Sequence, residues 1–151
     1  MRVVLTTVKE ANVSIDNKII SQIKDGYLLL VGFTSGDNKE IVEKMTDKIL
    51  SLRVFPDERL LINKSIHDIN GDILSVSQFT LYADMRKGRR PSFVNALNPM
   101  EAEELYNYFN ECLVKKYKPI STGVFGAFME VSSINNGPFT VTLDSEELFH
   151  D

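Results

Sequence analysis

Cysteine, histidine and tryptophan are scarce in this sequence of 151 residues. It has no tryptophan, one cysteine (Cys112) and two histidines (His67 and His150). A single cysteine excludes an intrachain disulfide framework and a cysteine metal cluster. HxxxH and CxxC spacings are also absent, so we expect no metal site. His67 lies in a polar segment without a serine nucleophile beside it, which argues against a Ser-His-Asp triad.

Nucleotide-binding loops and long apolar runs are missing as well. No GxxxxGK[ST] or GxGxxG loop is present, and we expect no cofactor. The apolar segments are too short to span a membrane. Met1-Arg2 leads straight into the segment Val3–Val8 without the pattern of a signal peptide. The net charge of −4 argues against a strongly basic nucleic-acid binder. We therefore expect a cytoplasmic protein with no membrane association.

Hydrophobic periodicity predicts a single α+β domain over residues 1–151. A helix is expected from Asp37, with Asp37 as N-cap and Glu40 three residues later. A second helix is expected from Asn98, and its apolar stripe makes Cys112 a core thiol. Strands are expected at Arg2–Val8, Ala11–Asp16, Lys18–Lys24, Tyr27–Phe33, Arg53–Phe55 and Leu60–Ile62. A further strand is expected to begin at Asp72, and others lie between Thr122 and Leu143. Asn63–Asn70 is expected to be turn-rich, and Asn135–Pro138 to form a turn. This order predicts a curved, mostly antiparallel β-sheet or barrel with two packed helices.

Polar residues interrupt the apolar strand that begins at Asp72. Read as a continuing strand, the segment places Gln78 and Thr80 on one face and Ser77 and Phe79 on the other. Such groups cost free energy if they are buried without partners. The segment is therefore either a half-solvated strand or a strand end that presents hydroxyl and amide groups to a polar ligand. The strand alone does not decide between them.

The only dense basic cluster follows this strand. It consists of Arg86, Lys87, Arg89 and Arg90, with Gly88 between them. A solvated loop with surplus charge and a loop that contacts phosphates are both compatible with this pattern.

Three segments together resemble the signature stretches of the bacterial and eukaryotic D-aminoacyl-tRNA deacylase family. They are Ser77–Leu81 (SQFTL), Lys87–Phe93 (KGRRPSF) and Asn135–Thr140 (NNGPFT). Gly26–Gly32 and Gly123–Met129 are also similar to that family, so the resemblance covers nearly the whole chain. Each short motif is weak alone, whereas the set in this order and spacing is strongly specific.

The resemblance implies an enzyme that hydrolyses the ester between a D-amino acid and the 3′-terminal adenosine of tRNA. It implies a homodimer of β-barrel-like subunits, with the active sites at the subunit interface. The Gly137-Pro138 peptide would be cis and inserted into the partner's pocket, where its carbonyl oxygens reject L-amino acids. Glycine has no side chain, so glycyl-tRNA would be discriminated poorly.

The resemblance also implies roles for individual residues. The catalytic segment comprises Ser77, Gln78, Phe79 and Thr80; Phe125 and Met129 line the pocket of the terminal adenosine; and Lys87, Arg89 and Arg90 contact tRNA. Thr80 and the backbone N–H of Phe79 would position the ester carbonyl and stabilise its oxyanion. The ribose 2′-OH is available to assist, which removes the need for a histidine base. Whether Thr80 acts as a nucleophile stays open.

The sequence departs from the family pattern at three places. Thr6-Thr7 stands where the family usually has Gln-Arg, and that Arg is thought to brace the Gly-Pro loop. Phe139 replaces the usual Val, and Glu58–Ile62 lacks a common Gly-Lys-Met pattern. Two other classes of function are compatible with the sequence: a non-catalytic RNA-binding module, and a dimeric sheet protein with a structural role. Turnover of D-aminoacyl-tRNA separates the enzyme from both.

Overall fold

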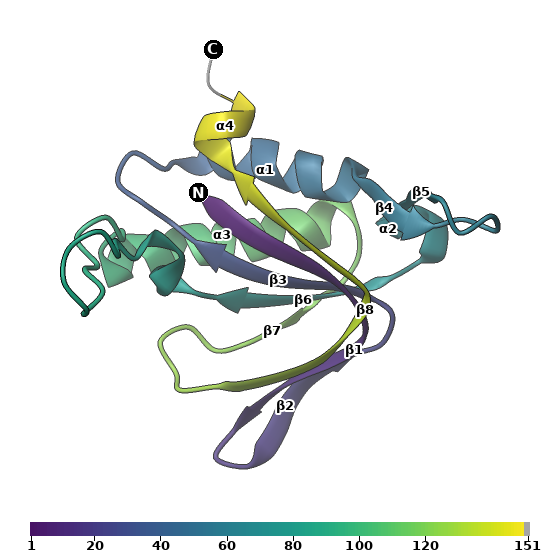
Figure 1. Cartoon of the computed structure of the whole chain (residues 1–151), viewed down its shortest axis with the longest axis horizontal. Helices are drawn as coiled ribbons and strands as arrows, with labels where there is room; N and C mark the ends of the chain where they lie inside the picture. Colours follow the sequence, from purple (N-terminus) through teal and green to yellow (C-terminus); the bar gives the residue numbers. More distant parts are fainter. Residues whose placement is uncertain (150–151) are drawn as a thin grey trace.

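A curved sheet with helices on one side makes up the fold (Figure 1). The computed structural model describes residues 1–149, so His150 lies outside the described residues. Its elements are β1 (Arg2–Ile15), β2 (Lys18–Ile23), β3 (Gly26–Gly32), α1 (Lys39–Ser51), β4 (Arg53–Pro56), β5 (Ile62–Ser65), α2 (Ile66–Ile69), β6 (Asp72–Ser77), η1 (Phe79–Tyr82), α3 (Pro99–Lys116), β7 (Ser121–Thr122), β8 (Glu130–Asp144) and α4 (Ser145–Phe149). The α+β class and the mostly antiparallel sheet are confirmed, with two short helices beyond the two expected.

The long strand β1 is the centre of the sheet. Its first half pairs with β3, its second half pairs with β2, and β8 runs antiparallel along nearly its whole length. Two strands were expected here, but β1 is continuous because β8 spans the junction between them. Asp16 and Asn17 turn the chain into β2 with positive φ angles of 50° and 64°, which confirms the predicted tight turn.

Two pairs of strands in the sheet are parallel. β3 pairs with β6, and β6 pairs with β7. Between β3 and β6 the chain crosses over through α1 and the small β4–β5 sheet. The main hydrophobic core includes buried residues of α1, α3 and the sheet, such as Met45, Phe109 and Leu29. A second cluster, around Val13 and Leu74, is formed by β1, β2, β3 and β6.

The two long helices begin at asparagines. Asn98 accepts a hydrogen bond from Glu101 N–H at 3.0 Å, which confirms the predicted start of α3. For α1 the predicted N-cap is wrong by one residue: Asn38, not Asp37, accepts from Ile41 N–H, at 3.0 Å. The Asp37 carboxylate instead pairs with the buried N-terminal ammonium of Met1 at 2.7 Å. Cys112 is buried on α3 as expected, and that burial raises the pKa of its thiol.

The segment after β4 also differs from expectation. Leu60–Ile62 was expected to be a strand, but Leu60 has a φ of 62° in a turn, and β5 begins only at Ile62. The Asp57 carboxylate holds this turn by accepting from Arg59 N–H at 2.8 Å and Leu61 N–H at 3.1 Å. The stretch expected to be turn-rich contains most of β5 and α2, and α2 begins with a Ser65–Asp68 capping box. None of the helices among residues 1–149 has the length and hydropathy needed to cross a membrane.

Strand β8 contains a large bulge. The turn expected at Asn135–Pro138 does not separate two strands, because β8 stays paired with β1 on both sides of it. Thr6 pairs with Thr140 and Val8 with Asn135, so residues 136–139 have only Thr7 opposite them. The Gly137–Pro138 peptide in this bulge is cis, as the resemblance implied.

Candidate functional site

The chain turns sharply at the end of β6. Gln78 N–H donates to the carbonyl of Val31 in β3 at 2.7 Å, and Leu81 N–H then donates back to the carbonyl of Gln78 at 3.2 Å. The prediction that Gln78 and Thr80 share one face of a continuing strand is therefore wrong. Since β3 itself ends at Gly32, a longer β6 would have no partner on that side. The turn into η1 buries Tyr82 instead.

Gly32 lets this turn lie directly against β3. A Cβ atom at Gly32 would lie 2.8 Å from the carbonyl oxygen of Gln78 and 3.1 Å from Leu81 Cβ. Arg2 also holds the turn, because its Nη1 donates to the carbonyl of Leu81 at 2.9 Å. Its Nε donates to the Asp144 carboxylate, also at 2.9 Å. The position of the turn therefore depends on residues outside the turn.

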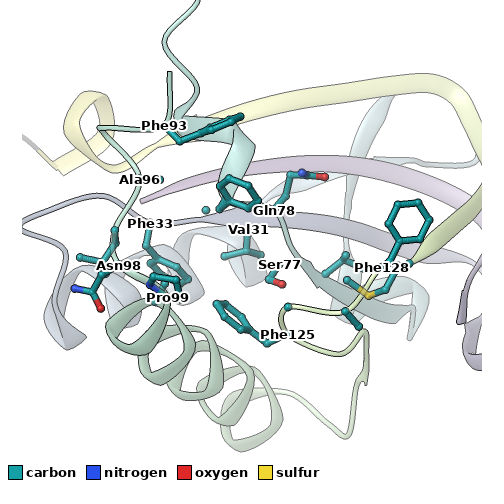
Figure 2. A pocket seen from close by; sticks show the side chains of 18 of the residues that line it. Val31, Phe33, Ser77, Gln78, Phe93, Ala96, Asn98, Pro99, Phe125 and Phe128 are labelled. Atoms are coloured by element: carbon teal, nitrogen blue, oxygen red, sulfur yellow. The ribbon is translucent and has the colours of Figure 1, made fainter. Parts of the chain in front are cut away.

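A cavity of about 580 Å³ opens beside the turn (Figure 2). Its lining comes from the ends of β3 and β6, from the start of α3, and from the loop that precedes β8. Figure 2 shows Asn98, the N-cap of α3, and Pro99 on one side of the cavity and Phe125 and Phe128 of the loop on another. The lining is mainly apolar, with the polar side chains of Ser77, Gln78 and Asn98. An apolar wall with a few polar groups suits a ligand that carries a flat ring and hydrogen-bonding groups.

The loop that closes the cavity was expected to be a strand. Only Ser121–Thr122 pairs with β6, and residues 123–129 form a loop. Val124 N–H contacts Met129 Sδ at 3.4 Å, which folds the loop back on itself. This fold brings Phe125 and Met129 to the cavity, while Phe128 stays 90% exposed.

The segment predicted to be catalytic is only partly at the cavity. Ser77, Gln78 and Phe79 line it, and Phe79 also packs edge-on against Phe93, with ring centroids 5.0 Å apart. Thr80 is exposed and does not line the cavity; its Oγ1 accepts a hydrogen bond from Gln78 Nε2. The first N–H groups of a helix have no acceptor within the helix. In η1 the N-cap residue Gln78 forms no side-chain capping bond to them.

The Gly137–Pro138 bulge lies at a different place in the chain. Gly137 and Pro138 line a groove of about 500 Å³ together with Thr7, Val54 and Pro56. None of the residues of this groove lines the first cavity. Within one chain, the structure therefore brings Ser77, Gln78, Phe79, Phe125 and Met129 together, and it does not bring Gly137 and Pro138 to them.

The basic residues lie on an exposed loop that closes on itself. Asp84 and Ser92 exchange two backbone hydrogen bonds of 2.7 and 2.9 Å at its base. Arg86 forms two side-chain hydrogen bonds with the Asp84 carboxylate, at 2.9 and 2.8 Å, and these lower the pKa of Asp84 to about 2. Lys87, Arg89 and Arg90 are exposed, and none of them forms an ion pair with another residue of 1–149.

Sequence reasoning gave no role in the site to several residues inside the quoted segments. Phe93 and Phe128 lie inside the quoted motifs, but only the fold shows that they border the cavity. The sequence marked Thr7 as a departure from the family pattern and Gly32 as part of a similar segment. Only the fold shows their contacts, which are with segments far along the chain. In the described part of the chain, no group of three or more His, Cys, Asp or Glu side chains is arranged to hold a metal ion.

Comparisons with known proteins agree with the resemblance. The family model described as D-Tyr-tRNA(Tyr) deacylase matches residues 4–144. A D-aminoacyl-tRNA deacylase of Listeria innocua is 53% identical over 148 residues, covering 98% of this chain and 99% of the relative. One from Clostridium acetobutylicum is 46% identical over 149 residues, covering 99% of this chain and all of the relative.

Two solved structures are similar to this chain in fold. A protein titled c-Myc DNA Unwinding Element Binding Protein superposes with a TM-score of 0.91 at 41% identity, covering 95% of this chain and 98% of that chain. A probable eukaryotic D-amino acid tRNA deacylase is similar in fold, with a TM-score of 0.82 at 18% identity over 94% of this chain and 97% of that chain. The family match over most of the chain and the full-length relatives lead to one conclusion: this chain belongs to the D-Tyr-tRNA(Tyr) deacylase family.

Proposed function

We propose that this protein hydrolyses the ester bond of D-aminoacyl-tRNA and releases the free D-amino acid and tRNA. One observation carries the proposal: a mainly apolar cavity of about 580 Å³ lies directly beside the turn formed by Ser77, Gln78 and Phe79. The cavity has room for a nucleoside, and the turn supplies polar groups at its edge. Membership of the deacylase family supports this choice of substrate.

The terminal adenosine would bind among the aromatic and sulfur-containing side chains of the loop before β8. Phe125 and Met129 line the cavity there. An adenine ring can stack on such side chains. The aminoacyl ester on the ribose would then extend toward Ser77 and Phe79.

Hydrolysis would depend on positioning of the ester, since His67, the histidine among residues 1–149, does not line the cavity. The N–H of Phe79, at the start of η1, can donate to the oxyanion that develops on the ester carbonyl. Thr80 contributes a hydroxyl beside it, joined to Gln78 by a hydrogen bond. The aminoacyl ester is already activated toward hydrolysis, so weak catalytic assistance is enough. The neighbouring ribose 2′-OH can supply it.

Chiral selection would require a second copy of the chain. Gly137 and Pro138 line a groove that shares no residue with the cavity, so they can act on the substrate only if a partner chain brings them there. In such a homodimer their carbonyl oxygens would exclude the side chain of an L-amino acid. Glycyl-tRNA, which carries no side chain, would pass this filter and be hydrolysed too.

The exposed basic loop would contact the tRNA backbone. Lys87, Arg89 and Arg90 are the candidates, because Arg86 is already engaged with Asp84. Each phosphate contact adds affinity that falls as the salt concentration rises. Since aminoacyl-tRNA is made and used in the cytoplasm, this substrate implies a cytoplasmic location.

A non-catalytic RNA-binding module is the alternative function. The basic loop and the exposed ring of Phe128 favour it, since both features suit single-stranded RNA. The test is deacylation of matched D- and L-tyrosyl-tRNA by the purified protein. Rapid release of D-tyrosine with slow release of L-tyrosine supports the proposal. Binding of both tRNAs without turnover refutes the enzyme and leaves the binding module.

A further inference from the structure

The bulge in β8 lacks the ladder of hydrogen bonds that holds the rest of the strand. Residues 136–139 have only Thr7 of β1 opposite them. Backbone groups in a bulge of this kind need other partners to hold one conformation. The conformation of Gly137 and Pro138 therefore depends on the side chains around them.

Two side chains supply hydrogen bonds to the backbone of the bulge. Thr7 Oγ1 donates to the carbonyl of Asn136, the residue directly before Gly137, at 2.9 Å. Asn135 Oδ1 accepts from Phe139 N–H, directly after Pro138, also at 2.9 Å. The Gly137–Pro138 pair is thus held on both sides by neutral hydrogen bonds.

Thr7 is the partner that lies on the neighbouring strand, β1. Its side chain is one of few buried polar groups, with 4% of the residue exposed. Burial and the stiff χ1 of a β-branched residue restrict where its hydroxyl can point. Asn135, by contrast, lies in β8 beside the bulge and is exposed. Thr7 therefore ties the bulge to the rigid centre of the fold.

We propose that Thr7 is a positioning residue that sets the selectivity for D- over L-aminoacyl-tRNA by fixing the Gly137–Pro138 bulge through the carbonyl of Asn136. Thr7 also lines the same groove as Gly137 and Pro138. The inference rests on the proposed function, in which carbonyl oxygens of this bulge exclude L-substrates. A hydrogen bond between neutral groups is little affected by salt, so the selectivity should be constant with ionic strength.

The test compares Thr7→Val with Thr7→Ser. Val keeps the shape of the side chain and removes the hydroxyl, whereas Ser keeps the hydroxyl. Thr6→Val is the matched control, because the Thr6 hydroxyl contacts Thr140 Oγ1 at 3.3 Å outside the groove. Thermal unfolding shows whether each variant is folded, and Thr7→Ala provides a second variant without the hydroxyl.

The principal measurement is the ratio of kcat/KM for D- and L-tyrosyl-tRNA. Thr7→Val should lower this ratio roughly 2- to 12-fold, the factor that corresponds to one net hydrogen bond. Thr7→Ser and Thr6→Val should keep the wild-type ratio. The second measurement is amide hydrogen exchange at Phe139, which should be faster in Thr7→Val because the bulge opens more often.

The two measurements separate this inference from the proposed function. If folded Thr7→Val and Thr7→Ala keep the wild-type ratio, the role of Thr7 in selectivity is refuted at any exchange rate, while the deacylase activity stands. If the wild-type protein does not hydrolyse D-tyrosyl-tRNA, the proposed function and the selectivity role both fail. Faster exchange at Phe139 would then show only that Thr7 orders the bulge.

Discussion

Gly32→Ala should move the turn that carries Ser77, Gln78 and Phe79. The added Cβ would lie 2.8 Å from the carbonyl oxygen of Gln78, and ordinary contact begins at 3.4 Å. The turn must therefore retreat by about 0.6 Å, the difference between these distances. A backbone carbonyl cannot swing aside as the end of a flexible side chain can, so β3 and the turn must separate.

The size of the effect follows from this displacement. Overpacking of this kind costs about 1–3 kcal/mol of folding free energy. For a chain of this length that corresponds to a fall in Tm of about 2–12 °C. A misplacement of about 1 Å can cost about 100-fold in rate, so a shift of about half that size should lower kcat/KM for D-tyrosyl-tRNA roughly tenfold.

Gly71→Ala is the matched control. A Cβ atom at Gly71 would lie 2.8 Å from Ile66 Cδ1 and 3.0 Å from Ile69 Cδ1, which are ends of flexible side chains. Its nearest backbone neighbour, the carbonyl oxygen of Asp25, would lie 3.3 Å away, compared with 2.8 Å for the Gln78 carbonyl at Gly32. Gly71 also precedes β6, at the opposite end of the strand from Ser77. Its variant should lose some stability and keep the wild-type kcat/KM below its melting temperature. A folded Gly32→Ala protein with wild-type kcat/KM would refute the link between Gly32 and the site.

Four further predictions concern the remaining parts of the proposal. Arg89→Glu should weaken tRNA binding and reduce by about one the slope of binding affinity against salt concentration. Lys48→Glu, an equal change of charge on the last turn of α1, should leave this slope unchanged. Equal effects of the two variants would show that the basic loop makes no specific contact with tRNA. The hydrogen bonds from Arg86 lower the pKa of Asp84 from 3.8 to about 2. Their contribution to loop stability is therefore present above about pH 4 and is lost as the pH falls through about 2. In a carboxyl NMR titration, Arg86→Gln should return the pKa of Asp84 toward its ordinary value, and an unchanged pKa would contradict this assignment. Thr80→Ala should stay folded and lower kcat roughly 10- to 1000-fold if its hydroxyl positions the ester, and full activity would exclude Thr80 from the reaction. Light scattering at micromolar concentration should give about twice the chain mass of 17.1 kDa, and a monomer that still deacylates would remove the need for a second chain.

Local patterns in the sequence determined most of the elements. The Asn98-Pro99 start of α3 and the Asp16-Asn17 turn follow from the chemistry of caps and tight turns, which involves neighbouring residues only. The periodicity of α3 likewise placed Cys112 in the core. Even here the N-cap of α1 shifted by one residue, because a distant ammonium group pairs with Asp37.

The motif set determined the family, and it predicted the cis Gly137–Pro138 peptide. It also grouped Ser77, Gln78 and Phe79 with Phe125 and Met129, which the structure places around one cavity. These residues are far apart along the chain, so only the resemblance could join them before the fold was known. Periodicity alone gave a different result, because it extended β6 through Thr80.

Only the tertiary structure decided where β6 ends and what holds the bulge of β8. β6 stops at Ser77 because its parallel partner β3 ends at Gly32, and the length of a strand is set by its neighbours. The Thr7–Asn136 hydrogen bond joins residues that are 129 positions apart, and the separation of Gly137 from the cavity likewise depends on the path of the whole sheet. Such contacts arise from strand pairing over long sequence distances, and local preference along the chain carries no information about them.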